Sequence, residues 1–460
     1  MVTNPKTIAI VGGGFTGGTI AYHLAQAGAE ARILVFEPRR RLGGGLAYDT
    51  RDAAYRINVP AAKMSLIPGD DGHFAQWIAA TDALSDDPQA RGPDGNFYPR
   101  REMFGRYVAD QLAGALAQGR VIHIRDSVAK MTRDGDRWSI VGVSGREEQA
   151  DIIALATTHP APMVPAVLDR SLGDDPRLIR DSCAGDALGA VAPDARVLIV
   201  GTGLTMADVV ASLDARGHTG PITALSRRGL LSRGHSPQPV TPLGEFADRP
   251  QTALSLLRDV RRGIAAAADQ GVSWHAVIDA VRAQGQTLWP TLTVQERRRI
   301  VRHLRPFWDV HRFRVAPQIE QVLQRRLGEG TLEVFAASLR GASAGPGAID
   351  VEFRRRWRAA TEHRSFDAIV ITTGPAHQLA LATQPHLAGL ARAGLIRADD
   401  VGLGLACDRQ GRALDRDGVP VPGFYIAGPL ARGTFGELMG LPQVAEYAQF
   451  IANQILGLPR

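Results

Sequence analysis

The chain of 460 residues contains only two cysteines, Cys183 and Cys407, and they lie far apart in the sequence. A C-x-x-C pair is missing, which disfavours a dithiol redox centre, a disulfide framework and a thiolate metal site. We therefore expect no metal.

Long apolar runs and long basic runs are also missing. No apolar stretch approaches the roughly 18 residues of a membrane span, and the first residues lead into a predicted strand instead of a signal peptide. A cytoplasmic protein without a membrane partner is the default expectation. The formal net charge of +6 suits anionic dinucleotides at least as well as nucleic acid, which is not an expected partner.

The most informative stretch is residues 7–17, TIAIVGGGFTG, in which an apolar strand runs directly into a glycine turn. Apolar residues at helical spacing follow, so the G-x-G-x-x-G pattern has the strand–turn–helix context that it needs. Gly12 permits a tight turn, Gly14 lets backbone N–H groups approach a pyrophosphate, and Gly17 lets the helix pack against the strand. The helix N-terminus then presents its positive end to the phosphates.

The next predicted strand, residues 32–36, ends at Glu37, twenty residues beyond Gly17. A carboxylate at this position accepts hydrogen bonds from a ribose 2′-hydroxyl. A glycine turn with a chance acid nearby is the alternative, which this context disfavours. The first unit is predicted to bind a dinucleotide.

A second strand–turn–helix unit begins at residues 196–200 and turns at Gly201 and Gly203, although Met206 replaces the third glycine. From Gly12 to Glu37 is 25 positions, and from Gly201 to Ser226 is also 25. Ser226 therefore occupies the position of the ribose-binding acid.

Two arginines, Arg227 and Arg228, follow Ser226 directly. A carboxylate would repel a 2′-phosphate, whereas a hydroxyl and guanidinium groups can bind it, so the second dinucleotide is predicted to be NADPH. The alternative is that both arginines are surface charges in a turn. His235 and Arg233 would then be the next candidates.

The length predicts two or three domains. Strand–Thr turns at Thr157 and at Thr373–Gly374 end the two units and mark two crossings between domains. We expect a first part of the FAD-binding domain at 1–160, an NADPH-binding domain at 161–375 and a return segment at 376–460. A helical insertion is predicted at about 242–328, in which the segment WDVHRFR either lines a pocket or forms an ordinary surface helix.

The chain resembles the flavoproteins with two dinucleotide-binding domains. GGGFTG, LGGGLAYDT, INVPAAKMS, FYPRREMFGRY, VGTGLTMADVV and ALSRRGLL resemble the bacterial FAD–NAD(P)-binding protein family, which is flavin monooxygenase-like. The resemblance implies an α/β fold with two Rossmann-like domains, the second inserted in the first and carrying the helical insertion. It also implies FAD and NADPH as cofactors, and it leaves a homodimer open.

The resemblance implies a set of cofactor-binding positions and places Asn58 near the flavin ring, where it is also the one candidate catalytic residue. A purely structural Asn58 is the alternative. The expected cofactor-binding residues are Gly12, Gly13, Gly14, Phe15, Thr16, Gly17, Glu37, Pro38, Arg39, Gly45, Ala47, Asn58, Val128, Gly201, Gly203, Leu204, Thr205, Ser226, Arg227, Arg228, Gly374 and Gly428.

The sequence departs from the pattern of its relatives at three places. Gly428–Pro429 stands where many have Gly-Asp, Thr158–His159 lacks the usual glycine, and the Baeyer–Villiger signature is absent before the second fingerprint. The way in which the ribityl chain is held is therefore open, and ketone-to-ester chemistry is less favoured.

The leading hypothesis is an NADPH-reduced FAD monooxygenase that uses O₂ and a C4a-(hydro)peroxyflavin on a small amine or sulfur substrate. One alternative is an NADPH dehydrogenase that passes electrons to a carrier or small acceptor. Another is a non-catalytic flavin-binding partner protein.

Overall fold

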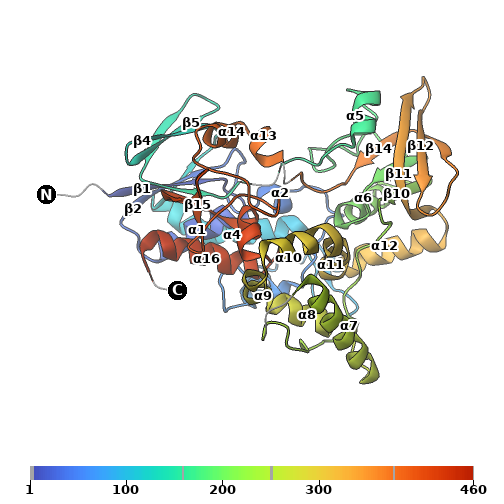
Figure 1. Cartoon of the computed structure of the whole chain (residues 1–460), viewed down its shortest axis with the longest axis horizontal. Coiled ribbons are helices and arrows are strands. Elements are labelled where there is room, and N and C mark those ends of the chain that lie inside the picture. The colour runs from blue at the N-terminus through green and yellow to red at the C-terminus, as the bar shows by residue number, and fades with distance from the viewer. Residues whose placement is uncertain (1–4, 158–159, 249–251, 377–378, 459–460) are drawn as a thin grey trace.

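The computed structural model describes residues 5–157, 160–248, 252–376 and 379–458. The chain forms two lobes with a bundle of helices between and below them (Figure 1). The lobe that contains β1 and α16 carries both ends of the chain. The other lobe contains β10, β11 and β12.

A six-stranded sheet in the order β15-β16-β7-β1-β2-β3 forms the first lobe. Its neighbours are parallel except for β15 and β16. The strands are β1 (Lys6–Val11), β2 (Ala31–Phe36), β3 (Val121–Ile124), β7 (Ile152–Leu155), β15 (Arg412–Leu414) and β16 (Pro420–Ile426). A small antiparallel sheet is added by β4 (Val128–Asp134), β5 (Arg137–Gly142) and β6 (Glu147–Ala150).

Helices and short turns cover this lobe, with α16 packed against α1. The helices are α1 (Phe15–Gln26), α2 (Gly45–Tyr48), α3 (His73–Thr81), α4 (Arg101–Ala117), α13 (Ala380–Thr383), α14 (Pro385–Arg392), α15 (Arg432–Phe435) and α16 (Gln443–Leu456). The 3₁₀ turns are η1 (Ala61–Lys63), η2 (Pro88–Ala90) and η5 (Gly428–Ala431).

A seven-stranded sheet in the order β13-β12-β11-β10-β9-β14-β8 forms the second lobe. Its strands are β8 (Leu178–Ile179), β9 (Val197–Val200), β10 (Ile222–Ser226), β11 (Leu332–Ala344), β12 (Ile349–Arg355), β13 (Glu362–Phe366) and β14 (Ala368–Ile371). Its helices are α5 (Ala166–Leu172), α6 (Leu204–Ala215) and α12 (Pro317–Gly328). In this sheet β11, β12 and β13 pair antiparallel and the other neighbours are parallel. Two sheets with parallel central strands of Rossmann type confirm the predicted α/β fold class.

The two lobes repeat one another in detail. Asp151, before β7, accepts a hydrogen bond from the Thr7 N–H at 2.7 Å, and Asp367, before β14, accepts one from the Arg196 N–H at the same distance. Both aspartates lie where two parallel strands begin side by side. They satisfy backbone donors that the strand ladder leaves without a partner.

The helical segment after β10 forms a separate bundle with its own apolar core, which includes Phe246, Val277 and Leu288. Its helices are α7 (Ala253–Asp269), α8 (Trp274–Ala283), α9 (Gly285–Thr291), α10 (Val294–Arg299), the π-helical turn η3 (Ile300–Leu304) and α11 (Arg305–Arg312). In contrast, α12 packs on α6 as the crossover between the parallel strands β10 and β11. We therefore propose that the insertion ends before Pro317.

The return segment after residue 376 adds β16 to the sheet that β1 begins, with Phe424 in register with Ile153. Phe424 is fully buried, and its ring lies 4.9 Å from that of Trp138. This contact joins the last part of the chain to the first.

Because a truncated core aromatic loses buried area and leaves a cavity, Phe424→Ala should lower the free energy of unfolding of the first lobe by about 3–5 kcal/mol. Urea unfolding followed by tryptophan fluorescence measures this change. Val419→Ala, at a side chain that is 57% exposed just before β16, is the matched control and should change little. Equal stability of both variants would show that the return segment folds apart from the first lobe.

Candidate functional site

The first glycine turn brings backbone segments together more closely than side chains allow. Gly12 has a φ of +98°, and a Cβ there would lie 2.5 Å from the Ala156 carbonyl oxygen. A Cβ on Gly17 would overlap the carbonyl oxygen of Gly12. Both positions therefore require glycine, and Gly14 becomes the N-cap of α1.

Glu37 lies beside this turn and is 3% exposed. Its Oε2 accepts from the Gly13 N–H at 3.1 Å, and its Oε1 accepts from the Arg39 backbone and guanidinium at 3.0 and 3.1 Å. Three donors from two residues thus hold the carboxylate at the end of β2, and Pro38 separates Glu37 from Arg39. A carboxylate has lone pairs left to accept from ribose hydroxyls.

Two further segments close around the turn. The Gly43 N–H donates to the Gly13 carbonyl at 2.8 Å, and a Cβ on Gly14 would lie 3.2 Å from the Cα of Gly45. Gly428 has a φ of +64°, and a Cβ there would lie 2.7 Å from the Thr16 hydroxyl oxygen. The first glycine turn, the loop that contains Gly43 and Gly45, and the turn at Gly428 therefore meet at the N-terminus of α1.

A buried hydroxyl tests whether this turn fits a ligand. Thr157 Oγ1 is buried without a hydrogen-bond partner among the described residues, and Thr157 Cα would lie 3.0 Å from a Cβ on Gly12. In the second lobe, Thr373 holds the corresponding position and donates to the Met163 carbonyl at 2.9 Å. The unsatisfied hydroxyl in the first lobe fits a bound cofactor, whereas the departure at Thr158–His159 lies outside the described residues.

The second turn has the same geometry and different polar groups. Gly201 has a φ of +124°, and a Cβ there would collide with Thr372. Gly203 is the N-cap of α6, whose first residues are Leu204 and Thr205, and a Cβ on Gly203 would have no neighbour within 4 Å. The N-terminus of α6 is therefore open to a phosphate.

Ser226, at the end of β10, shares a hydrogen bond of 2.9 Å with the Thr202 hydroxyl and accepts from the Gly229 N–H at 2.9 Å. Arg227 is exposed, and no described residue forms an ion pair or hydrogen bond with its side chain. Arg228 instead donates to the His303 carbonyl at 3.2 Å and lies 5.0 Å from the centre of the Phe307 ring. The two adjacent arginines are thus not equivalent.

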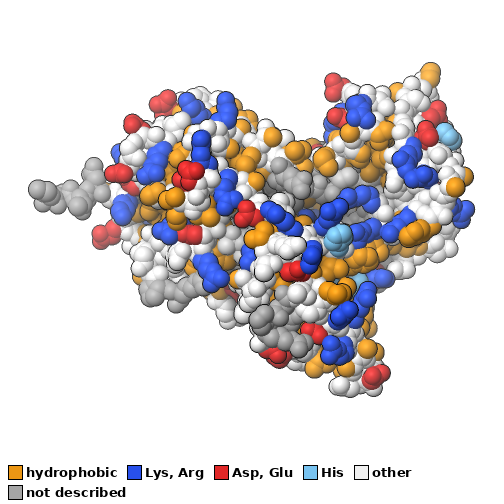
Figure 2. Space-filling view, viewed as in Figure 1, with side chains coloured by type: hydrophobic (Ala, Val, Ile, Leu, Met, Phe, Trp, Pro, Cys, Tyr) orange, Lys and Arg blue, Asp and Glu red, His pale blue; other side chains and the backbone are white. Residues whose placement is uncertain are grey.

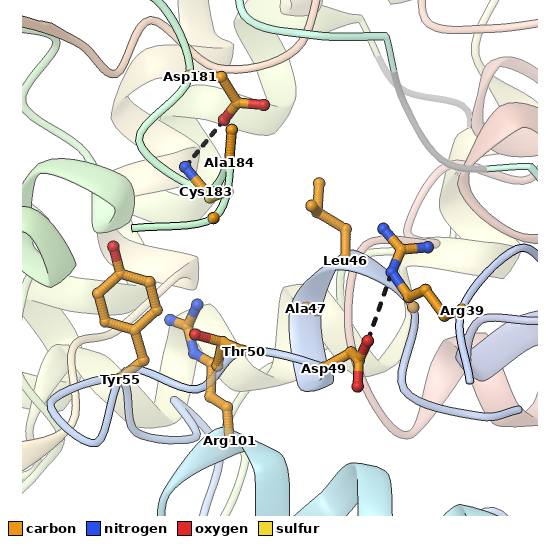
Figure 3. Close-up of a pocket in the computed structure, with 12 residues that line it drawn as sticks. Arg39, Leu46, Ala47, Asp49, Thr50, Tyr55, Arg101, Asp181, Cys183 and Ala184 are labelled. Atoms are coloured by element: carbon orange, nitrogen blue, oxygen red, sulfur yellow. Dashed lines mark hydrogen bonds and ion pairs between the residues drawn. The ribbon is translucent and has the colours of Figure 1, made fainter. Parts of the chain in front are cut away.

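A cavity of about 410 Å³ opens between the lobes (Figure 3). Gly45, Leu46 and Ala47 form one wall, Tyr55 and Arg101 another, and the segment 181–185 faces them from the second lobe. Because Gly45 also contacts the first turn, this cavity borders the predicted dinucleotide site. Figure 2 shows Lys and Arg side chains gathered in the hollow between the lobes.

Buried polar contacts fix the two lobes against each other. Arg101, the first residue of α4, donates to Asp208 of α6 at 2.7 Å, and Ser212 of α6 donates to Asp52 at 2.5 Å. Burial raises the pKa of Asp208 to about 6, although Arg101 opposes this rise. The face of α6 that carries Asp208 and Ser212 therefore sets the position of the second lobe.

Asn58 lies at this junction, since its carbonyl accepts from His235 Nε2 of the second lobe at 2.9 Å. Val128 begins β4 after the short loop that follows β3, whose Ile124 carbonyl accepts from the Glu37 N–H at 3.0 Å. Gly374, with a φ of +78°, lies at the second crossing and makes no close contact with the first turn.

Several residues at the junction were not predicted from the sequence as site residues. They are Thr157, Asp208 and the cavity-lining residues Tyr55 and Arg101, whereas Arg39, Gly45 and Ala47 of the same cavity were predicted. The Arg100–Arg101 pair before a helix was visible in the sequence, but its partner Asp208 is 107 positions away. The sequence has no local pattern that joins them.

The comparisons with known proteins agree with this geometry. Residues 9–160 match the family model described as FAD-NAD(P)-binding, which covers the first glycine turn, Glu37 and Asn58. No curated protein matches the chain in sequence. The first lobe therefore contains a FAD-NAD(P)-binding domain, in agreement with the cofactors that the sequence predicts.

Similar solved structures span the whole chain. Ornithine N-hydroxylase from Kutzneria sp. 744 is 17% identical with a TM-score of 0.67, covering 98% of this chain and 99% of its own. L-lysine 6-monooxygenase from Pseudomonas syringae is 18% identical with a TM-score of 0.64, covering 98% of both chains. Bacillithiol disulfide reductase from Staphylococcus aureus is 13% identical with a TM-score of 0.57, again covering 98% of both chains. The chain therefore has the fold of flavoproteins with two dinucleotide-binding domains.

The cofactor site can be tested at Gly14. Gly14→Glu places a carboxylate where the pyrophosphate is expected and drives a side chain into Gly45, so the purified protein should be colourless. Flavin absorbance per mole of protein measures occupancy. Gly114→Glu on α4 is the control, because a Cβ there meets nothing within 4 Å. Normal FAD occupancy in Gly14→Glu contradicts the assignment.

The junction should also respond to pH through His235. Burial, with the nearby Arg314 guanidinium, lowers the pKa of His235 from 6.5 to about 4. A carbonyl can only accept, so neutral His235 donates from Nε2 to Asn58. His235 takes up a proton more readily in the unfolded chain than in the folded protein. Neutral His235 therefore stabilises the fold fully above pH 6.5, and this contribution is lost as the pH falls from 6.5 towards 4.

His235→Gln should therefore flatten the fall in melting temperature of the protein between pH 7 and pH 4.5. His303→Gln, at an exposed position of η3, should leave the wild-type slope unchanged. Parallel wild-type and His235→Gln curves would rule out a buried, neutral His235.

Proposed function

We propose that the chain is a FAD-dependent oxidoreductase reduced by NADPH, and specifically a monooxygenase that acts on a small amine or sulfur nucleophile. One oxygen atom of O₂ enters the substrate and the other leaves as water, while NADPH supplies two electrons. Two glycine turns of matching geometry but different polar groups carry this proposal: Glu37 stands at the first and Ser226 with Arg227 at the second.

The fold supports this proposal, and it also occurs in a protein of another activity. Ornithine N-hydroxylase and L-lysine 6-monooxygenase share it over nearly their full length, but so does a disulfide reductase. Dithiol chemistry needs paired cysteines, whereas Cys183 lines the cavity and Cys407 is buried elsewhere as a second free thiol. The cysteines therefore favour the monooxygenase class over the disulfide reductases.

When bound, FAD supplies hydride acceptance from NADPH and the activation of O₂. The protein residues bind and orient. The N-terminus of α1 would hold one pyrophosphate and that of α6 the other, while Glu37 would accept from the ribose and Arg227 would pair with the 2′-phosphate. The Arg101–Asp208 and Ser212–Asp52 contacts join the two lobes beside the cavity between them.

Anaerobic reduction followed by O₂ tests the proposal. NADPH should bleach the flavin, and O₂ should restore the oxidised spectrum in more than one phase, with less than one hydrogen peroxide per NADPH when a hydroxylatable amine is present. A single phase with one peroxide per NADPH, accelerated by small electron acceptors, would identify the dehydrogenase alternative. Absence of reduction by NADPH would identify the non-catalytic one.

Coenzyme choice gives a further prediction. Arg227→Ala should lower kcat/KM for NADPH by about tenfold or more, because a charge-assisted hydrogen bond contributes about 1.5–3 kcal/mol and 1.4 kcal/mol is tenfold. The value for NADH should change little. Steady-state flavin reduction with both coenzymes measures the ratio.

Arg228→Ala should have a smaller effect, because the contacts with His303 and Phe307 occupy its guanidinium. Arg302→Ala, an exposed position on η3, is the control for a general loss of positive charge. Equal losses with NADPH and NADH in Arg227→Ala would move the 2′-phosphate site elsewhere.

A further inference from the structure

The turn between β12 and β13 carries the most exposed large hydrophobic side chain among the described residues. Trp357 is 89% exposed, and its φ of +67° lies in the left-handed region, which bulky side chains rarely adopt. Such a backbone conformation is strained, and an exposed ring gains no burial energy that would offset the strain. Packing within the second lobe therefore does not explain a tryptophan at this position.

Neighbouring side chains hold this turn in place. Arg355, the last residue of β12, donates to Glu333 of β11 at 2.6 Å, and its guanidinium carbon lies 3.8 Å from the centre of the Phe335 ring. The guanidinium carbon of Arg356 lies 4.8 Å from the centre of the Trp357 ring, a cation–π contact that restricts the orientation of the ring. The tryptophan is thus presented on an anchored turn with most of its surface open.

The turn contacts the same residue as the loop that follows Ser226. The Arg356 N–H donates to the Ala336 carbonyl at 2.8 Å, and Ala336 pairs in register with Ser226. A Cβ on Gly229 would lie 2.5 Å from the Ala336 nitrogen. Since neighbouring strands lie about 4.8 Å apart, Arg356 is about 10 Å from Ser226 across β11. Figure 1 shows β10, β11 and β12 together in this lobe.

A dinucleotide on the second lobe would extend toward this turn. Its pyrophosphate is predicted at the N-terminus of α6, which follows β9, and its adenosine ribose at Ser226, which ends β10. The sheet order β9-β10-β11-β12 continues in the same direction, so the adenine attached to that ribose would reach over β11 toward Trp357. Three exposed arginines that form no ion pair with a described residue add positive charge there, which suits an anionic nucleotide. They are Arg354, Arg356 and Arg358.

We propose that Trp357 stacks on the adenine ring of the second dinucleotide. The proposal rests on the NADPH site argued above and adds a residue that binds the base instead of the 2′-phosphate. An aromatic side chain that stacks on a base strengthens binding about five- to hundredfold. Contact with adenine would also cover the ring surface that is open in the structure, which accounts for a tryptophan at a strained and exposed position.

The test titrates the oxidised, FAD-containing protein with NADP⁺, so that no turnover occurs, and calorimetry measures affinity. Trp357→Gly removes the ring and suits the left-handed φ. It should weaken the binding of NADP⁺ and of adenosine 2′,5′-bisphosphate about five- to hundredfold. Its melting temperature should equal or exceed that of wild type. Trp357→Phe should bind with intermediate affinity, because it keeps a smaller ring.

Two comparisons separate stacking from other effects. Nicotinamide mononucleotide lacks adenine and should bind wild type and Trp357→Gly equally. NAD⁺ has the same adenine as NADP⁺, so Trp357→Gly should weaken both by the same factor, whereas Arg227→Ala should weaken NADP⁺ alone. Val419→Ala, at an exposed apolar side chain of the first lobe, is the control and should bind NADP⁺ as wild type does.

Tryptophan fluorescence gives a second readout. Because Trp357 is exposed, acrylamide should quench its emission, and adenosine 2′,5′-bisphosphate should reduce this quenching in wild type. The same nucleotide should leave the quenching of Trp357→Phe unchanged. If Trp357→Gly does not fold, Trp357→Asn replaces it, because asparagine also tolerates the left-handed region.

Unchanged affinity for NADP⁺ in Trp357→Gly would overturn the stacking role. Weaker binding together with a lower melting temperature would also overturn it, because the ring would then support the fold. Wild-type protein that binds neither NADP⁺ nor the bisphosphate would overturn it as well, and reduction of the flavin by NADPH would still decide the proposed function. Conversely, a dehydrogenase outcome in the O₂ experiment would overturn the monooxygenase proposal and leave the stacking role standing.

Discussion

The structure depends on a steric constraint at two glycine turns, where backbone atoms occupy the space that a side chain would need. At Gly12 and Gly201 the carbonyl groups that end β7 and β14 approach so closely that no Cβ fits. This approach sets the distance between the central strands and the helix that follows each turn. Because the helix N-terminus is fixed by the same contact, the phosphate-binding position and the sheet are determined together. A substitution there disturbs the fold and the site at once.

The same backbone geometry leaves the polar positions free to differ. In the first unit a backbone N–H, that of Gly13, donates to the Glu37 carboxylate, whereas in the second the hydroxyl of Thr202 meets that of Ser226. Among the described residues, the Thr157 hydroxyl has no hydrogen-bond partner, where Thr373 donates to a carbonyl. The first unit thus has a carboxylate at the predicted ribose position, and the second has a hydroxyl there with Arg227 beside it, whose side chain pairs with no described residue. Two units with the same strand–turn–helix geometry can in this way favour different dinucleotides.

The sequence alone was sufficient for features whose signal is local. A strand, a glycine turn and a helix lie within twenty residues of each other, so both turns, Glu37 and Ser226 could be located by spacing. Distant contacts leave no such pattern. Arg228 looks equivalent to Arg227 in the sequence, yet in the structure its guanidinium lies over the ring of Phe307 in the helical insertion. Nor does any periodicity connect Arg312 with Glu437, 125 positions later, because their approach depends on how the insertion docks on the first lobe.

The contacts between the lobes limit how the two sites can move. Arg101 and Asp208 form a buried ion pair. The positive charge of Arg101 only partly offsets the desolvation of the Asp208 carboxylate, since the pKa of Asp208 stays raised. Such pairs add little net stability, but removing one partner leaves the other charge buried without compensation at a cost of about 3–5 kcal/mol. A large rotation of one lobe would break this pair, the Ser212–Asp52 contact and the His235–Asn58 hydrogen bond together. These three contacts therefore favour the relative orientation of the lobes that the structure shows.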